Sequence, residues 1–262
     1  MLASISLNKK NYSIDLSKPI DISIPLRAGK KNVNAFFMPD VIIEPFRVGG
    51  FIGAVNKGGS CNVNNIIFNP HGNGTHTECV GHISKEFISL NQCLKEFFFL
   101  AKLITIKPEK RGQDLVISKA QVEKAFSKNA TMSNVKALII RTLPNTPGKL
   151  TRKYSGTNPA YLDKDAAQWI REKEIDHLLL DLPSVDREMD GGNLAAHHAF
   201  WNYPKKTRMN ATITELIVVP EKVKDGYYLL NLMIASFEND ASPSKPVLYE
   251  VGEKQKVKWD LV

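Results

Sequence analysis

Three nearly continuous runs of apolar residues constrain the fold of this chain most strongly. They span residues 97–106, 135–142 and 175–182, and the second run is rich in β-branched side chains. Apolar runs of this length are typical of strands buried on both faces of a sheet, since a solvated face would introduce regular polar positions. We therefore expect three buried strands.

Other segments carry weaker strand signals. Residues 21–26 alternate polar and apolar side chains with a period of two, as a half-buried strand does. Residues 62–68 form another expected strand, which leads directly into a histidine-rich segment. The region from Asn239 is expected to be a loop followed by an edge segment. A hairpin is predicted from two strands and the turn between them: residues 211–219, 222–226 and 227–236.

Two helices are expected between the strands. Ser118 followed by Gln121 has the form of a capping box, which opens a helix that ends near Lys128. A second helix covers residues 163–173, with these apolar side chains facing inward: Ala166, Ala167, Trp169 and Ile170. Strands interspersed with helices over residues 1–262 predict a single domain of the α/β or α+β class.

The composition fits a folded globular protein. Hydrophobic residues make up 43% and charged residues 24%, which argues against disorder. The formal charge of +8 raises the hypothesis of salt-dependent nucleic-acid binding. The lysines, however, are scattered in short groups, which favours a solvated surface, and we expect neither nucleic-acid nor membrane partners.

The three cysteines, Cys61, Cys79 and Cys93, indicate a reducing compartment. Their number is odd, and their spacing matches neither a CxxC motif nor the disulfide framework of a small secreted protein. The first residues lack the apolar length of a signal peptide, and no apolar run approaches the length of a membrane span. We expect a soluble, cytoplasmic protein.

The candidate chemistry concentrates in the histidines. Five of the six occur in two places: His71, His76, His82, His197 and His198. In an extended chain the side chains of His76 and Glu78 share one face, and His82 returns to that face if the extension continues. Imidazole and carboxylate are suitable ligands for zinc, manganese or iron, so the segment around residues 71–82 predicts a metal site.

Some reactive residues have simpler interpretations. His177 lies inside an apolar run and is expected to be a core histidine. Cys79 is either a nucleophile paired with His76 or His82, or a small buried thiol; in an extended segment it would point away from Glu78. A serine nucleophile is disfavoured because no Gly-x-Ser-x-Gly motif is present.

The histidine-rich segment also resembles a known signature. Gly74-Thr75-His76, followed by Glu78 and His82, is similar to the motif His-x-Gly-Thr-His-x-Asp-x-Pro-x-His of the cyclase family, which includes bacterial kynurenine formamidase. Further similar segments occur on both sides of this motif, in the family order: residues 12–17, 24–26, 138–142, 180–186, 196–197 and 214–216. The resemblance implies a β-rich α/β domain of the swivelling β/β/α fold, usually a homo-oligomer, either a dimer or a tetramer.

The resemblance also implies a set of site residues. It implies one or two divalent ions, most commonly Zn²⁺, with Mn²⁺ as an alternative. His82 matches the family's general base. His198 is an alternative ligand to its neighbour. The implied metal ligands are His71, His76, Glu78, His197 and Glu215.

This chain departs from the family motif at three positions. Gly72 stands where the first family histidine falls, so His71 would take that place through a one-residue insertion. Glu78 replaces an aspartate, and Val80 replaces a proline. These departures keep open a second hypothesis, a non-catalytic metal- or ligand-binding protein of the same fold.

The function implied by the resemblance is metal-dependent hydrolysis of a small-molecule substrate, an amide, formamide, ester or lactone, as by an arylformamidase in tryptophan catabolism. Phe51 and Trp201 are candidate substrate-binding residues, with Tyr203 as a further aromatic, although each is equally compatible with ordinary core packing. Acidic and basic residues at 186–190 either hold the ligand histidines or form a solvated loop.

Overall fold

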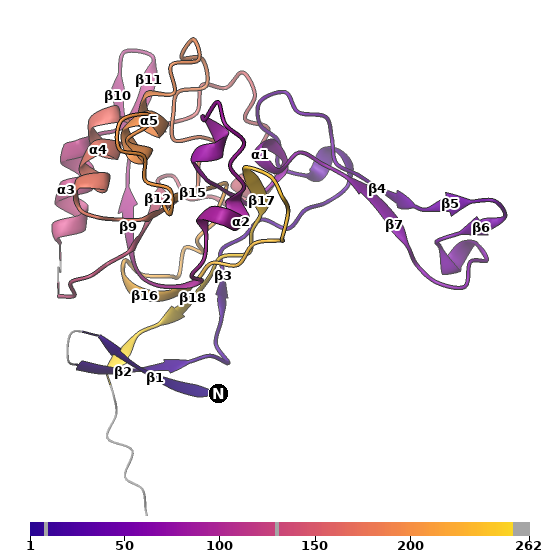
Figure 1. Ribbon diagram of the computed structural model, residues 1–262, viewed down its shortest axis with the longest axis horizontal. Coiled ribbons are helices and arrows are strands. Elements are labelled where there is room, and N and C mark those ends of the chain that lie inside the picture. Colours follow the sequence, from indigo (N-terminus) through magenta and orange to yellow (C-terminus); the bar gives the residue numbers. More distant parts are fainter. Residues whose placement is uncertain (8–9, 129–130, 254–262) are drawn as a thin grey trace, which may run out of the picture.

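The computed structural model describes residues 1–7, 10–128 and 131–253, and its body is one curled sheet of nine strands (Figure 1). Listed across the sheet, the strands are β17 (Ala241–Pro243), β8 (His76–Glu78), β15 (Thr212–Glu215), β14 (His177–Leu180), β12 (Ala137–Thr142), β9 (Phe98–Ile106), β16 (Gly226–Asn231), β18 (Val247–Glu250) and β3 (Ile20–Asp21).

The centre of the sheet is parallel and its flanks are antiparallel. Strands β9, β12, β14 and β15 are adjacent and parallel, whereas β8 and β17 on one side and β16, β18 and β3 on the other run antiparallel to their neighbours. The three apolar runs of the sequence become β9, β12 and β14, so the expectation of three buried strands is confirmed.

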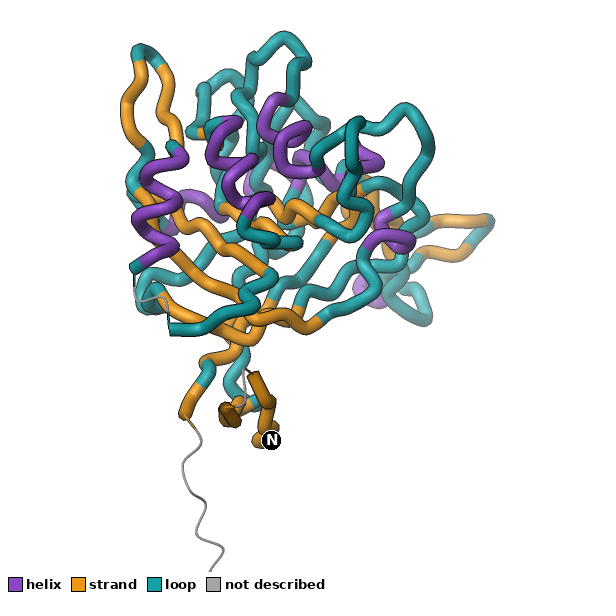
Figure 2. Tube along the Cα trace, turned by 60° about the vertical axis from the view of Figure 1, so that its left-hand side comes forward, coloured by secondary structure: helices purple, strands orange, loops and turns teal. Residues whose placement is uncertain are grey.

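Three helices cover one face of the sheet: α3 (Lys119–Ser127), α4 (Lys164–Glu172) and α5 (Ala195–Trp201) (Figure 2). The side chain of Gln121 accepts the Ser118 N–H at 3.1 Å, as expected for the start of α3. All four inward positions predicted for the second helix are buried in α4. No helix in the described ranges is long and apolar enough to cross a lipid bilayer.

Alternate residues of the central strands fill two apolar layers. In β12, Leu138 and Ile140 pack in the cluster that contains the helices, while Ala137 and Ile139 pack in the cluster on the opposite face. The second layer is closed by α2 (Leu90–Cys93) and by apolar residues of segment 217–223. Both faces are therefore buried, which explains the nearly continuous apolar sequence of these strands.

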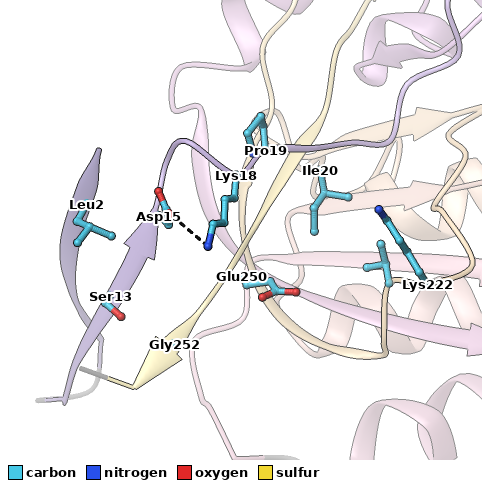
Figure 3. Close-up of a pocket in the computed structure, with 10 residues that line it drawn as sticks. Leu2, Ser13, Asp15, Lys18, Pro19, Ile20, Lys222, Glu250 and Gly252 are labelled. Atoms are coloured by element: carbon cyan, nitrogen blue, oxygen red, sulfur yellow. Dashed lines mark ion pairs between the residues drawn. The ribbon is translucent and has the colours of Figure 1, made fainter. Parts of the chain in front are cut away.

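A ribbon of two N-terminal strands and one late strand lies below the sheet (Figure 1). It pairs β1 (Leu2–Leu7) with β2 (Lys10–Asp15), and β2 with β19 (Gly252–Glu253). A cleft of about 660 Å³ lies between this ribbon and the sheet, and Lys18 pairs with Asp15 at 3.5 Å on its wall (Figure 3). None of the histidines lines this cleft.

A second ribbon projects from the body as a long arm (Figure 1). It consists of β4 (Ile42–Pro45) paired with β7 (Asn64–Ile67), continued by β5 (Arg47–Val48) and β6 (Phe51–Ile52). The expected strand at 62–68 is thus confirmed as β7, outside the main sheet.

The remaining elements of the described residues are short. They are α1 (Pro70–Asn73), β10 (Glu109–Arg111), β11 (Asp114–Ile117), β13 (Tyr161–Leu162) and four 3₁₀ helices: η1 (Gly29–Lys31), η2 (Val55–Lys57), η3 (Val80–His82) and η4 (Pro147–Leu150).

The strand expected at 21–26 is wrong beyond its first residue. Strand β3 ends at Asp21, whose carboxylate accepts the backbone N–H of Ser23 at 2.9 Å and its hydroxyl at 2.6 Å. This local turn competes with ladder pairing. Further on, the N–H of Ile24 donates to the Thr75 hydroxyl at 2.8 Å instead of to a neighbouring strand.

The predicted hairpin of residues 211–236 is also wrong. Strand β15 pairs with β14 and β8, whereas β16 pairs with β9 and β18, so the two strands lie on opposite sides of the sheet centre. The connection between them buries Ile217, Val219 and Val223 in the layer opposite the helices. Burial of these apolar side chains requires the chain to cross that face instead of turning back.

Candidate metal centre

The site is built on strand β8, where it pairs with β15. His76 and Glu78 are two residues apart and project from one face, as predicted from the extended segment. Glu215 is the cross-strand partner of His76, and its Oε2 lies 3.5 Å from His76 Nε2. All three side chains are almost completely buried. Glu215 is also the last residue of a parallel strand, which places the site at the carboxyl edge of the sheet centre.

His71 enters the site from the short helix α1. The Asn69 side chain accepts the His71 N–H at 2.9 Å and so fixes the start of this turn. His71 Nδ1 then lies 3.2 Å from Glu78 Oε2. Position 72 has no space for a ligand, because a Cβ on Gly72 would lie 2.8 Å from the Ala35 carbonyl oxygen. The structure therefore brings the ring of His71, and not residue 72, into the cluster beside Glu78.

His197 enters from α5, and Asp186 fixes its orientation. The Asp186 carboxylate accepts the N–H groups of Ala196 at 2.7 Å and His197 at 3.1 Å, and it contacts His197 Nδ1 at 2.6 Å. The opposite ring atom, Nε2, lies 3.1 Å from Glu78 Oε1. His198 points elsewhere: its Nδ1 contacts the Tyr203 carbonyl at 3.2 Å. Of the two adjacent histidines, the structure brings only His197 to the site.

His82 reaches the site by a turn instead of an extended chain. It closes the 3₁₀ helix η3, and its Nδ1 lies 3.8 Å from Glu78 Oε2 and 3.4 Å from Asp240 Oδ2. Asp240, which our reading of the sequence did not single out, also lies 3.0 Å from His71 Nε2. The residue precedes β17, and the pairing of β17 with β8 carries it to the histidines. No local motif marks it; only this strand pairing does.

The electrostatics of the cluster favour bound positive charge. Burial opposes the charged form of His71, but Asp240 and Glu78 outweigh burial and raise its pKa to about 10. Burial likewise opposes charge on His197, yet Asp186 and Glu78 raise its pKa to about 10. Burial raises the pKa of Glu78, but His82 and His197 hold it well below its usual range. Protons on the rings thus balance the buried carboxylates, and a cation can do the same.

The donor atoms fit a divalent ion. His76 Nδ1 contacts the Gly74 carbonyl at 3.0 Å, which assigns the proton to Nδ1 and leaves an available lone pair on Nε2. His76 Nε2 and Glu78 Oε2 are buried atoms that make no hydrogen bond within the described residues. Among the described residues, three groups have ligand atoms within 4.8 Å of one another: His71, His76 and Glu78; Glu78, His82 and His197; His71, His82 and Asp240. Glu78 belongs to two of these groups, as do His71 and His82, so the donor atoms form one continuous cluster.

Both proposed aromatic contacts lie outside this cluster. Trp201 is completely buried, packs against the His197 ring at 5.5 Å and donates its indole N–H to the Ala211 carbonyl at 2.9 Å. It therefore supports His197 from within the core and is not available to a substrate. Phe51 lies in β6 on the projecting arm, away from the site of its own chain (Figure 1). The hydroxyl of the half-buried Tyr203 accepts the Lys85 N–H at 3.4 Å.

The other reactive residues are placed in the core or in loops. His177 is buried, contacts the Thr212 hydroxyl at 2.8 Å and packs on Phe99, as expected for a core histidine. Cys79 lies in the apolar layer on the opposite face of the sheet from Glu78, so it is not aligned with the histidines. Of the charged residues at 186–190, Asp186 alone contacts a site histidine.

Sequence comparisons identify relatives over most of the chain. A family model described as "Putative cyclase" matches residues 14–187. The kynurenine formamidase of Bacillus mycoides (strain KBAB4) is 28% identical over 193 residues, covering 72% of this chain and 81% of the relative. The kynurenine formamidase of Bacillus anthracis is 27% identical over 235 residues, covering 88% of this chain and 97% of the relative.

Solved structures with the same fold include two isatin hydrolases. Isatin hydrolase A from Labrenzia aggregata, bound to benzyl benzoate, aligns with a TM-score of 0.66 over 90% of this chain and 94% of that chain, at 11% identity. An isatin hydrolase bound to the product analogue thioisatinate gives a TM-score of 0.64 over 89% of this chain and 92% of that chain, at 13% identity. At these identities the likeness concerns the fold, and the α/β class expected from the sequence is confirmed.

The two neighbouring histidines of α5 give a matched test of metal binding. We predict that His197→Ala, purified in excess zinc without chelator, loses most of its bound metal, because the variant lacks a ring atom 3.1 Å from Glu78. His198→Ala is the control and retains the wild-type metal content. Elemental analysis of the folded proteins measures both. Equal metal content in the two variants would contradict the assignment of His197 as a ligand.

Proposed function

Because the chain belongs to the Cyclase family, we propose that it is a metal-dependent hydrolase of an amide bond, with an aryl formamide or a related cyclic amide as substrate. The observation that carries this proposal is the convergence of His71, His76, His82 and His197 on the buried Glu78 carboxylate. The names of the relatives, kynurenine formamidase and isatin hydrolase, support this substrate class, and we propose a role in tryptophan catabolism.

We propose Zn²⁺ as the metal, with Mn²⁺ as the alternative, in one or two sites. The mixture of imidazole and carboxylate donors supports either ion, and the shared carboxylate of Glu78 supports a pair. A divalent ion bound there would act as a Lewis acid toward a carbonyl oxygen and would lower the pKa of a water molecule. The residues that would hold it are His71, His76, Glu78, His197 and Glu215.

His82 and Asp240 are suited to proton transfer. Both are partly exposed, with side-chain accessibilities of 29% and 25%, whereas Glu78 and His197 are almost completely buried. A substrate therefore approaches from the side of His82. The Asp240 carboxylate, 3.4 Å from His82 Nδ1, orients the ring so that Nε2 faces away from it. His82 Nε2 would accept a proton from the nucleophile and return it to the leaving nitrogen.

A non-catalytic role loses its main support in this geometry. That alternative was motivated by Gly72, which replaces the first histidine of the family motif. The ring of His71 occupies the site, in contact with both Glu78 and Asp240. The glycine at position 72 therefore does not remove a histidine from the cluster, because His71 supplies one beside Glu78. The proposed enzyme keeps a full set of donors together with a candidate base.

We further propose a cytoplasmic homo-oligomer, a dimer or tetramer, assembled through the arm. Two-stranded ribbons are marginally stable alone in water, and this arm exposes many apolar side chains: Ile42, Val48, Val63, Ile66 and Ile67. Cover by another copy of the chain would account for both features. The three free cysteines support a reducing compartment.

The proposed assembly through the arm can be tested by the mass of the protein in solution. Replacement of Ile66 and Ile67 by serine is expected to lower the oligomeric mass measured by light scattering, since both side chains are more than half exposed on the arm. The far-UV circular dichroism of the variant should remain unchanged. A wild-type protein with the mass of one chain would contradict the proposed assembly.

The function predicts a selective defect in His82→Ala. We expect wild-type metal content and a kcat for an aryl formamide lowered by roughly 10²–10⁴-fold, the usual contribution of a general acid or base. Activity should be measured on an aryl formamide, isatin and a simple aryl ester. Failure of the metal-loaded wild type on all three substrates would refute the proposed hydrolase.

Asp240→Asn tests the orienting carboxylate. The asparagine keeps the size of the side chain but removes its charge, so we expect a loss of about 10–100-fold in kcat with metal content retained. Glu238→Gln, two residues earlier, is the matched control, because that carboxylate contacts the Asn91 amide and no site histidine. Equal kcat values for the two variants would remove Asp240 from the mechanism.

A further inference from the structure

Two buried thiols lie in one apolar layer behind the metal centre. Cys79 is 0% exposed and Cys93 is 2% exposed, and both belong to the apolar layer on the face of the sheet opposite the helices. The two thiols interact across this layer, although Cys93 is contributed by α2 and Cys79 follows β8. The pair is not part of the proposed hydrolytic chemistry, because Cys79 projects away from the histidines.

A cavity reaches Cys93 from the surface. Cys93 lines a pocket of about 270 Å³, together with the buried residues Phe99 and His177. The exposed residues Lys95 and Glu96 line the same pocket. This volume admits a small polar oxidant such as hydrogen peroxide, so Cys93 is the thiol that such a reagent meets first.

Cys79 links the pair to three residues of the metal centre. It is the peptide neighbour of Glu78, and its backbone N–H donates to the Asp240 carbonyl at 3.0 Å. Its thiol also caps η3, the turn that ends at His82: Sγ accepts the Gly81 N–H at 3.4 Å and donates to the Ile88 carbonyl at 3.5 Å. The turn has little freedom to adjust, since a Cβ on Gly81 would lie 2.1 Å from that carbonyl oxygen.

We propose that Cys79 and Cys93 are a redox modification site, in which a disulfide formed by a hydroperoxide reversibly lowers the activity of the metal centre. Cys93 Sγ attacks one peroxide oxygen, giving a sulfenic acid and one water molecule. Cys79 Sγ then attacks the Cys93 sulfur, forming the S–S bond and releasing a second water molecule. The two thiols lose two electrons and two protons, and the peroxide is reduced. Cytosolic disulfides are commonly transient and redox-sensing, which suits this pair.

The disulfide would act on the site through the cap of η3. An oxidised Cys79 sulfur has no S–H to donate to Ile88 and must turn toward Cys93. The N-cap of η3 is then altered at the residue between Glu78 and the turn that carries His82. A dithiol reductant reverses the bond and restores the cap. The effect on turnover rests on the proposed hydrolase function, whereas formation of the bond does not.

The experiment uses the metal-loaded full-length protein in a Cys61→Ser background, since Cys61 is an exposed thiol. After exposure to hydrogen peroxide, the protein is denatured in an alkylating reagent and digested with trypsin, which cleaves after Lys85 between the two cysteines. We expect the tryptic peptides 58–85 and 86–95 to be joined, with a mass lower by two hydrogen atoms. We also expect hydrolysis of the aryl formamide to fall at least severalfold and to recover with dithiothreitol.

Cys93→Ser in the same background is the matched control and should keep its activity after the same exposure. Full alkylation of both thiols, under conditions that oxidise Cys61 in the wild type, would overturn the disulfide. Oxygen addition to Cys93 without a link would overturn it as well. A link that leaves turnover unchanged would overturn the regulatory role alone. Absence of turnover in the reduced protein would instead count against the hydrolase, and the peptide masses would still decide whether the bond forms.

Discussion

The buried carboxylate of Glu78 is the group on which the site depends. It is 1% exposed and lies at the edge of an apolar core, where an uncompensated charge is strongly unfavourable. Histidines from three separate elements, α1, η3 and α5, surround it and supply the compensation. Each element is fixed by its own contact: Asn69 at α1, the Cys79 thiol at η3 and Asp186 at α5. The fold therefore places positive charge, from protons or from a metal, around one acidic group.

The cluster has a buried side and an accessible side, and the proposed chemistry follows this division. His76, His197 and Glu215 are enclosed between the sheet and α5, where their orientations are fixed. His71, His82 and Asp240 retain partial exposure, so a substrate and water can reach them. A rigid buried half suits the holding of a cation, and an open half suits exchange of reactants and protons. The thiol pair lies behind the buried side of the cluster, and Cys79 is the residue directly after Glu78.

Local sequence predicted those features that depend on neighbouring residues. The apolar runs gave the central strands, the period of two placed His76 and Glu78 on one face, and the amphipathic pattern identified α4. Features that depend on distant pairing were not predictable in this way. Asp240 reaches His71 because β17 pairs with β8, and the supposed hairpin separates because Ile217 and neighbouring side chains are buried under the sheet. Trp201 follows His197 by four residues and shares its helix face, as this spacing indicates. The Trp201 side chain is nevertheless buried in the core, so it packs against His197 and not against a substrate.

A crystal structure of the zinc-loaded protein, measured with anomalous scattering above and below the zinc absorption edge, tests the metal centre most directly. We predict an anomalous peak that marks a zinc ion within bonding distance of Glu78, with His76 and other donors of the cluster as further ligands. A second peak would share the Glu78 carboxylate with the first. Zinc bound only to surface side chains, or no peak within bonding distance of Glu78, would contradict the proposal that this cluster is a metal centre.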